Sequence, residues 1–287
     1  MLTRARELEL QEFAIDIRAE IAKCIAATET HSGHVGGSFS LAELMAVLYG
    51  EIMRVDPKNP KWEDRDYFVM SKGHCGPAMY ATLALRGFFP MEMLKTMNRG
   101  GTDLPSHTDR LHTPGVDMST GSLGQGASTA VGLAYADKLD GRTDRYTYLV
   151  LGDGEITEGQ VWEAANFAAA KSLNQLIVFI DQNGKQDPFS PYVSDPDNTA
   201  DRFRVFGFDV QECDGHSIRA LYDCIQHAKT EQKPSAIIMH TKKGKSIPEI
   251  EDMECNHSIP VNEDLLERLL TAFTKQKIAL VQEERSE

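Results

Sequence analysis

Short apolar runs that alternate with helical patterns constrain this chain more than any other feature of its sequence. The run at 176–180 is apolar throughout, which is typical of a strand buried on both faces of a sheet. Further strands are predicted at 67–70, 146–151, 207–212 and 235–241. Strands and helices in alternation predict an α/β fold, with a mostly parallel sheet, right-handed crossovers and helices on both faces.

Helices are predicted at both ends of the chain and between the strands. Apolar positions from Leu10 onward recur every three or four residues, which predicts an N-terminal helix over about 4–27. A glycine-rich segment at 31–39 breaks this pattern, and Ser40 is expected to cap a second helix that ends near Met53. The other predicted helices begin at Gly73 and span about 158–171, 216–228 and 262–281, the last with Asn262 as its cap. We expect residues 1–287 to form one domain.

Composition excludes several classes of protein. The 287 residues include 30 Lys and Arg against 43 Asp and Glu, a net charge of −13, which disfavours general binding to nucleic acid or to an anionic membrane surface. No run approaches the roughly 18 apolar residues that a membrane-spanning helix needs. The five cysteines are scattered without a Cys-x-x-Cys pair, so we expect reduced thiols and a cytoplasmic protein.

Three connections are longer than plain links between strands and helices. They cover 98–122, 183–199 and 241–260, and each contains glycine, histidine or carboxamide groups. Loops of this length in a compact α/β domain are usually functional or disordered. We therefore expect them to contribute to a binding site.

The stretch around Asp153 is the most informative for function. It reads Gly152-Asp153-Gly154 directly after a buried strand, and Asn183 follows the next strand. Because ligands bind outside the carboxyl ends of parallel strands, Asp153 and Asn183 are expected to face one small volume. Their oxygens, with a backbone carbonyl beyond Asn183, suit a hard cation such as Mg²⁺ that also holds phosphate oxygens. Gly-Asp-Gly alone is equally consistent with a strand-ending turn, and the order of strand, motif, helix, strand and Asn is the more specific signal.

Further motifs accompany this stretch in a fixed order. They are Ser32-Gly33-His34, Ser71-Lys72-Gly73-His74, Ser119-Thr120-Gly121-Ser122-Leu123-Gly124-Gln125-Gly126, and the continuation of the Asp153 stretch to Glu158-Gly159. Together they resemble the N-terminal, thiamine diphosphate-binding half of a transketolase over about residues 10–260.

The resemblance implies a site for thiamine diphosphate and a divalent cation. Its implied metal ligands are Asp153, the side chain of Asn183 and the main-chain carbonyl of Lys185, for Mg²⁺ with Ca²⁺ or Mn²⁺ as substitutes. The implied cofactor contacts are Gly121 and Leu123 against the aminopyrimidine, Gly152 and Gly154 beside the diphosphate, and Glu158 in an acidic network between paired sites.

Four histidines are also implied to act at this site. His34, His74 and His107 match histidines that line the reactive end of the cofactor and the substrate channel, and His257 matches one near the diphosphate and the channel mouth. Imidazole titrates near the working pH and can take and return protons of sugar hydroxyls, which agrees with these roles. For any one histidine alone, a structural or solvated side chain is the simpler interpretation.

The chain departs from the family pattern after its central strand. Gln182-Asn183 stands where the family has two asparagines, and 185–189 reads Lys-Gln-Asp-Pro-Phe in place of an apolar pair followed by Asp-Gly. The apolar wall beside the thiazolium is then in doubt locally, and Ile247 is a candidate to supply part of it. Lys242, Lys243 and Lys245 could attract phosphate or could form an exposed basic turn.

The resemblance further implies a divided enzyme. In transketolases the glutamate that activates the cofactor, and the arginines that hold the sugar phosphate, lie in a second domain, for which too few residues follow residue 260. We expect a separate C-terminal partner subunit carrying the pyrimidine-binding domain, an α₂β₂-type assembly, and transfer of a two-carbon ketol unit from a ketose (phosphate) to an aldose (phosphate). Two alternatives stay open: one chain of a 2-oxo acid dehydrogenase component or of a deoxyxylulose phosphate synthase-like enzyme, and a non-catalytic regulatory subunit.

Overall fold

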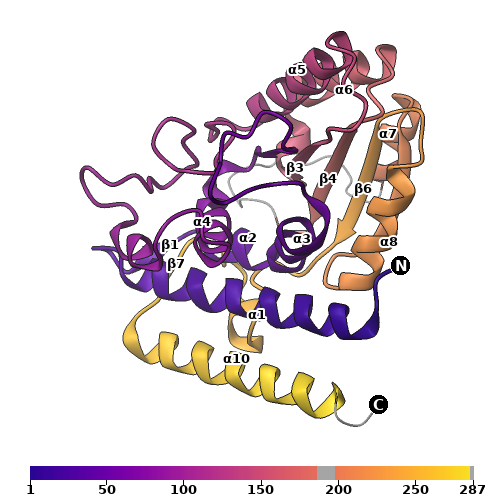
Figure 1. Cartoon of the computed structure of the whole chain (residues 1–287). Coiled ribbons are helices and arrows are strands. Elements are labelled where there is room, and N and C mark those ends of the chain that lie inside the picture. The colour runs from indigo at the N-terminus through magenta and orange to yellow at the C-terminus, as the bar shows by residue number, and fades with distance from the viewer. Residues whose placement is uncertain (186–197, 285–287) are drawn as a thin grey trace.

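The computed structural model describes residues 1–185 and 198–284 of the chain. Within these ranges, the centre is a parallel sheet with the strand order β2-β3-β4-β6-β5 (Figure 1). Its strands are β2 (Tyr67–Met70), β3 (Thr147–Gly152), β4 (Leu176–Gln182), β5 (Asp209–Asp214) and β6 (Ser235–His240). Each bound lies within two residues of its predicted position, and the predicted α/β fold is confirmed.

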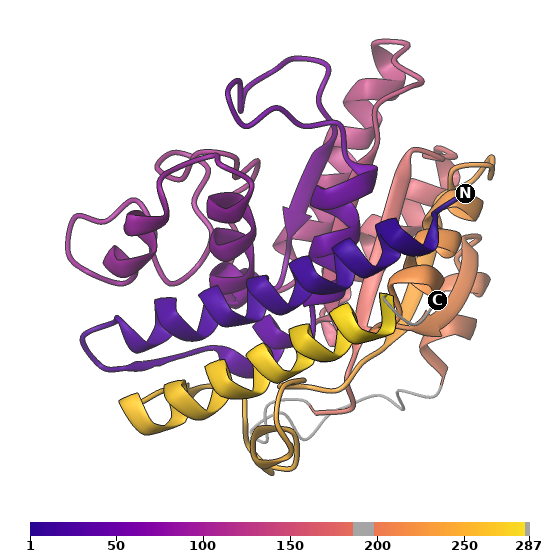
Figure 2. The ribbon, with the colours of Figure 1, turned by 60° about the horizontal axis from the view of Figure 1, so that its bottom comes forward.

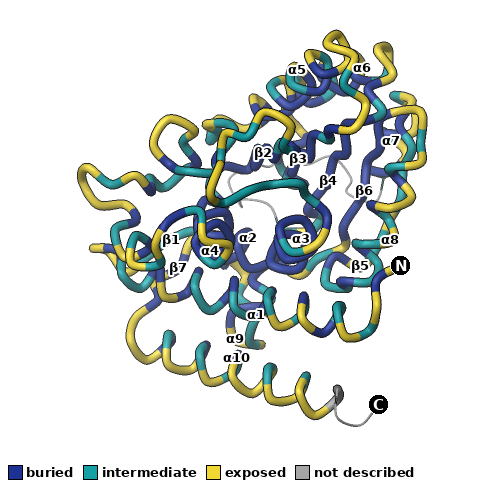
Figure 3. Tube along the Cα trace, viewed as in Figure 1, coloured by how far each residue is buried: buried dark blue, intermediate teal, exposed yellow. Residues whose placement is uncertain are grey.

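Helices cover both faces of the sheet because its strands are apolar on both sides. On β3, Tyr148 and Val150 belong to one apolar core, and Leu149 and Leu151 belong to the other. One face is covered by α5 (Gln125–Leu139), α6 (Gly159–Ala170) and α7 (Thr199–Val205). The other is covered by α2 (Val35–Phe39), α3 (Ala42–Val47), α4 (Gly76–Leu85) and α8 (Ile218–Ala228). Figure 3 shows that the central strands and α2, α3 and α4 are largely buried, whereas α5, α6 and α8 have exposed outer sides.

Two long helices lie side by side outside the second of these layers. They are α1 (Arg4–Ala26) and α10 (Glu263–Glu284), and they run antiparallel (Figure 2). Lys277 of α10 pairs with Glu12 (3.0 Å) and Asp16 (2.7 Å) of α1. The predicted cap of α10 is confirmed, because the side chain of Asn262 accepts a hydrogen bond from Leu265 N (2.9 Å). Among the helices of the described ranges, none combines the length and the apolar character needed to cross a membrane.

The predicted second helix is wrong at its start. Residues Val35–Phe39 already form α2 inside the glycine-rich segment, and the chain continues through α3 into a π-helical turn at Leu48–Ile52. Ser40 is not an N-cap: it takes the C-cap position of α2, and its hydroxyl donates to the carboxylate of Asp181 (2.7 Å). Glycine is needed in α2 for close packing, because a Cβ at Gly36 would lie 2.4 Å from the main-chain oxygen of Asn256. Tertiary contact therefore overrides the low helix propensity of glycine.

The described parts of the long connections lie at the carboxyl ends of the strands. The connection at 241–260 contains α9 (Pro248–Glu251) and β7 (Ile259–Pro260), and β7 pairs antiparallel with β1 (Ser32–Gly33). This pairing brings together two segments that are far apart in sequence, one ending in His34 and the other beginning with His257. Three short 3₁₀ segments, Gly73–Cys75, Met91–Thr96 and Glu155–Thr157, complete the described helical elements.

Candidate active site

A cavity of about 300 Å³ opens at the carboxyl ends of the strands. All the residues that the resemblance assigned to a site line this cavity: His34, His74, His107, Gly121, Leu123, Gly152, Asp153, Gly154, Glu158, Asn183, Lys185 and His257. They come from loops after β1, β2, β3 and β4 and from the three long connections. The parallel topology therefore brings residues more than 200 positions apart in the chain to one small volume.

The four histidines form one cluster. The ring of His34 lies 5.3 Å from that of His74, 5.7 Å from that of His107 and 5.1 Å from that of His257, measured between centroids. Burial, with the nearby Lys72 ammonium, holds the pKa of His74 far below its ordinary value. Burial also lowers the pKa of His34, helped by His107 and Lys243. His34 and His74 are therefore neutral at neutral pH, and a neutral imidazole can both donate and accept a proton.

Asp153 is held by backbone amides at the end of β3. Its Oδ2 accepts hydrogen bonds from Asn183 N (3.1 Å) and Gly184 N (2.9 Å), and its Oδ1 accepts one from Gly154 N (2.8 Å). Burial and the neighbouring carboxylate of Asp181 raise the pKa of Asp153 above its ordinary value. A carboxylate in this position is stabilised by a bound cation, because the cation offsets both effects.

The other two expected metal ligands lie directly beside Asp153 in the cavity. The side-chain oxygen of Asn183 accepts a hydrogen bond from Lys185 N (3.1 Å). The main-chain oxygen of Lys185 accepts one from the ammonium of Lys243 (2.7 Å). The three residues thus present one carboxylate and two neutral oxygens, which is the hard donor set that Mg²⁺ prefers.

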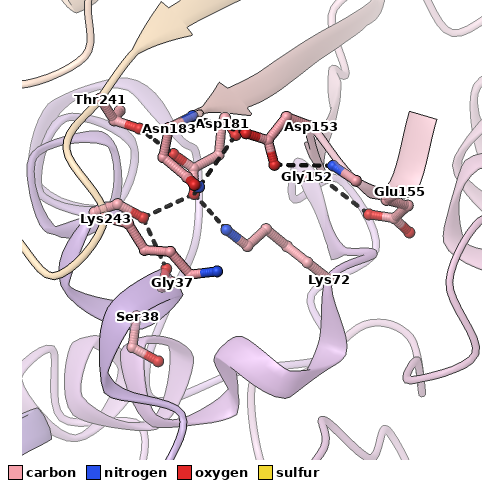
Figure 4. A network of polar contacts seen from close by, with 12 residues as sticks. Gly37, Ser38, Lys72, Gly152, Asp153, Glu155, Asp181, Asn183, Thr241 and Lys243 are labelled. Carbon is pink, nitrogen blue, oxygen red and sulfur yellow. Dashed lines mark hydrogen bonds and ion pairs between the residues drawn. The ribbon is translucent and has the colours of Figure 1, made fainter. Parts of the chain in front are cut away.

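Lys72 and Asp181 form a buried ion pair beneath the cavity, and the sequence motifs alone predicted a role for neither (Figure 4). Burial would raise the pKa of Asp181, but the ammonium of Lys72 and the hydroxyls of Thr241 and Ser40 lower it below its ordinary value. Burial would likewise lower the pKa of Lys72, and Asp181 raises it instead. Both groups are charged, and Lys72 lines the cavity as a fixed positive charge. The sequence feature that could have identified Lys72 is its position in the motif that contains Ser71 and His74.

The basic turn after β6 holds Lys242, Lys243 and Lys245, which could either attract phosphate or be exposed, and the structure shows that the three lysines differ. Lys243 is buried and lines the cavity, and burial and Lys72 lower its pKa. Lys242 and Lys245 instead pair with Glu251, at 2.8 Å and 3.8 Å. One lysine of the three therefore faces the cavity, and the other two fasten the turn to α9.

Glu155 fastens three of the motifs to one another, and sequence reasoning missed it. Its buried carboxylate accepts hydrogen bonds from Gly124 N (2.8 Å), Gly152 N (3.1 Å) and the hydroxyl of Ser71. Burial raises its pKa above the ordinary value. Gly124 has φ +83°, and a Cβ there would lie 3.0 Å from Cβ of Glu158. Glycine is required at this position by both its backbone conformation and its close contact.

Two departures from the family pattern bear on the cavity. Residues 186–189, expected to lack the usual apolar wall, lie outside the described residues. Ile247 packs against the helical core on the α1 side and is not among the described residues that line the cavity, so the structure does not support it as part of that wall.

Comparison with known proteins decides the family. The family model described as "Transketolase, thiamine diphosphate binding domain" matches residues 12–283. This chain belongs to the transketolase family. The matching region is the family's thiamine diphosphate-binding domain, so the resemblance seen in the sequence is confirmed.

Individual relatives in this family include both divided and single-chain proteins. The 6-deoxy-6-sulfo-D-fructose transketolase subunit SqwG of Clostridium sp. (strain MSTE9) is 45% identical over 85% of this chain and 89% of its own length. An apulose-4-phosphate transketolase subunit of Phocaeicola vulgatus is 38% identical over 81% of this chain and 83% of its own. The solved transketolase from Leishmania mexicana superposes with a TM-score of 0.86 at 32% identity, over 92% of this chain but 41% of that one. Transketolase relatives of subunit length therefore match this chain along most of their length.

Proposed function

We propose that this chain is the diphosphate-binding subunit of a two-chain transketolase. It transfers a two-carbon ketol unit from a ketose (phosphate) to an aldose (phosphate) with thiamine diphosphate and Mg²⁺. The observation that carries the proposal is the single cavity lined by the carboxylate and amide of the metal site together with four histidines. The match to two relatives that are themselves named as transketolase subunits supports the division into two chains.

The cavity fits a metal-bound diphosphate. Asp153, Asn183 and the carbonyl of Lys185 offer three oxygens to Mg²⁺, and Lys72 and Lys243 add positive charge on the same wall. A Cβ at Gly152 would make only ordinary van der Waals contacts, at 3.9 Å from Glu155 and Lys72, so packing within the chain does not itself require glycine at this position. When bound, thiamine diphosphate supplies the reactive carbon that carries the two-carbon unit between the sugars.

The side chains of this subunit would bind, orient and exchange protons. His34, His74, His107 and His257 would hold sugar hydroxyls and move their protons, since imidazole suits general acid–base transfer near neutral pH. A cation on the Lys185 carbonyl would displace the ammonium of Lys243 from it. Lys243 would then be free to offset the charge of the diphosphate.

The rest of the active site would come from a separate C-terminal subunit. We propose that this partner carries the pyrimidine-binding domain and that the two chains form an α₂β₂-type assembly in the cytoplasm. The sugars named for the two subunit relatives, 6-deoxy-6-sulfo-D-fructose and apulose 4-phosphate, both carry an anionic group on the chain. A ketose donor with an anionic group far from its carbonyl is therefore the substrate class to test first.

The test is reconstitution of the two chains. The co-purified pair with Mg²⁺ and thiamine diphosphate should convert a ketose donor and an aldose acceptor into products changed by two carbons, detected by mass spectrometry. Fructose 6-phosphate, xylulose 5-phosphate and 6-deoxy-6-sulfofructose are the donors to compare. Equal activity from this chain alone would contradict the division. Release of CO₂ from pyruvate would favour another thiamine diphosphate enzyme, and failure of the complex to bind the cofactor would favour a regulatory role.

A further inference from the structure

A fully buried asparagine lies behind the cavity wall, directly before His257. Asn256 is 1% exposed and is not among the described residues that line the cavity. Its side-chain Nδ2 donates hydrogen bonds to the main-chain oxygens of Lys243 (2.8 Å) and Ile250 (2.9 Å). Its main-chain oxygen accepts one from Gly36 N (3.1 Å). One residue thus joins α2, the turn that carries Lys243, and α9.

The backbones of α2 and of the turn that carries Lys243 are in close contact beside Asn256. A Cβ at Gly36 would lie 2.4 Å from the Asn256 main-chain oxygen, and one at Gly244 would lie 2.7 Å from its Nδ2. Gly244 N also donates a hydrogen bond to the oxygen of Gly36 (2.9 Å). With no side chain between them to absorb a displacement, a shift of Asn256 is passed on to both glycines.

A cavity residue lies within two positions of each of Gly244, Gly36 and Asn256. Lys243 directly precedes Gly244, and His34 lies two residues before Gly36. His257 follows Asn256, and its ring lies 5.1 Å from that of His34 and 4.9 Å from that of His74. The ammonium of Lys243 is at the end of a long flexible side chain, so its position depends on how firmly its backbone is held.

We propose that Asn256 is a positioning residue that sets Lys243 and the histidines His34 and His257 at their relative distances for cofactor binding. This inference rests on the proposed function. Without the amide of Asn256, the carbonyl of Lys243 loses the donor described here, whereas that of Ile250 keeps a hydrogen bond from Met253 N (3.3 Å). Movement of the turn that carries Lys243 would let its carbonyl find a new donor. Loss of this group should therefore weaken binding of the diphosphate more than it changes the chemical step.

The test compares variants in the two-chain complex. Asn256→Asp keeps the shape of the side chain but cannot donate to either carbonyl, and Asn256→Ser keeps one O–H donor. Asn262→Ala is the matched control, because it removes the cap of α10 and lowers stability without touching the cavity. The readouts are the Kd of Mg²⁺–thiamine diphosphate by titration calorimetry, the KM for the cofactor, kcat, and the Tm of each complex.

The expected result is graded. Asn256→Asp should raise the Kd by about tenfold or more and Asn256→Ser by less, the scale of losing buried hydrogen bonds. In Asn262→Ala the Tm should fall while the Kd stays unchanged. If Asn256→Asp does not fold, Asn256→Ser must still raise the Kd relative to the control. A Kd that is unchanged in both Asn256 variants, while the wild type binds the cofactor, overturns this inference alone. A wild-type complex that binds no cofactor overturns the proposed function instead.

Discussion

At the scale of single residues, the polar groups of the cavity depend on partners that are distant in sequence. Asp181 is fully buried and accepts from Lys72, Ser40 and Thr241, which lie on three different segments. Removing one partner of a buried ion pair strongly destabilises a protein, because the other charge is left unpaired. Replacing both partners with apolar residues often does not. The ion pair therefore places the positive charge of Lys72 at the cavity, and the chain is less stable than it would be with apolar residues at both positions.

This cost can be measured with a double-mutant cycle on Lys72 and Asp181. Lys72→Met and Asp181→Leu should each lower the free energy of unfolding by about 3–5 kcal/mol, because each leaves one buried charge unpaired. The double variant should lose clearly less than the sum of the two. Urea unfolding of the cofactor-free chain provides the four values. Additive losses would contradict a direct interaction between the two groups.

Asp153 should make cofactor binding depend on pH. Its pKa is raised in the folded, metal-free chain, so its contribution to stability is greatest below its ordinary pKa and is lost as pH rises through the raised value. Mg²⁺ binds the charged form. The rise in Tm caused by Mg²⁺–thiamine diphosphate should therefore be largest near neutral pH and shrink as pH falls toward the raised pKa.

The matched variants separate this effect from acid unfolding. Asp153→Asn should abolish most of the Mg²⁺-dependent rise in Tm at every pH, because the anionic ligand is gone. Asp201→Asn, on α7, removes an equal but largely exposed charge and should leave the rise intact. A normal Mg²⁺ response in Asp153→Asn would show that the cation binds elsewhere.

The sequence predicted the residues that carry the chemistry better than those that hold them. Asp153, Asn183 and the histidines stand in recognisable motifs, and the structure places all of them around one cavity. Glu155 and Asp181 were missed because their importance comes from burial and from partners on other segments. Neither property is encoded in local spacing. Lys243 was ambiguous because only the path of the turn decides which of its lysines faces inward.

At the scale of elements, strands were more predictable than helix starts. A strand buried on both faces is an apolar run whatever its neighbours are, which made the central strands predictable. The edge strand β5 also matched its prediction, although its residues are only partly buried. The start of α2 was not predictable, because Gly36 is helical only through its contact with Asn256. Local propensity therefore fails where another segment approaches the backbone.

Packing of α10 on α1 and α2 should be a major source of stability. Phe273 of α10 is 2% exposed, and its ring lies 6.0 Å from that of Phe39, between centroids. Phe273→Ala should lower the free energy of unfolding by about 3–5 kcal/mol, the range for a large side chain removed from a core. Ile278→Ala, on the same helix but 52% exposed, should change it by less than about 0.5 kcal/mol. Equal losses in the two variants, measured by urea unfolding, would show that α10 does not pack as described.

At the scale of the whole molecule, the cavity is open to solvent on a side that the proposed partner would cover. Leu123 lines the cavity with 36% of its surface exposed, and Glu158 is exposed beside it. These two exposed residues are the part of the cavity wall that we expect the partner chain to cover. The net charge of −13 agrees with this arrangement if Mg²⁺ and a few local cations neutralise the diphosphate and the partner supplies the groups for the anionic sugar.

Assembly can then be predicted from this open side. The co-purified chains should give a native mass corresponding to two copies of each, and removal of the partner should weaken binding of the cofactor.

Glu158→Ala should reduce the share of the tetramer, because Glu158 sits at the rim of the cavity where paired sites are expected to meet. Asp140→Ala, at the opposite end of α5 from Gly124, removes the same charge away from this rim and should leave assembly unchanged. Native mass spectrometry over a dilution series measures both. A tetramer that resists Glu158→Ala as well as Asp140→Ala would place the interface away from the cavity rim, and a complex of one copy each would exclude paired active sites.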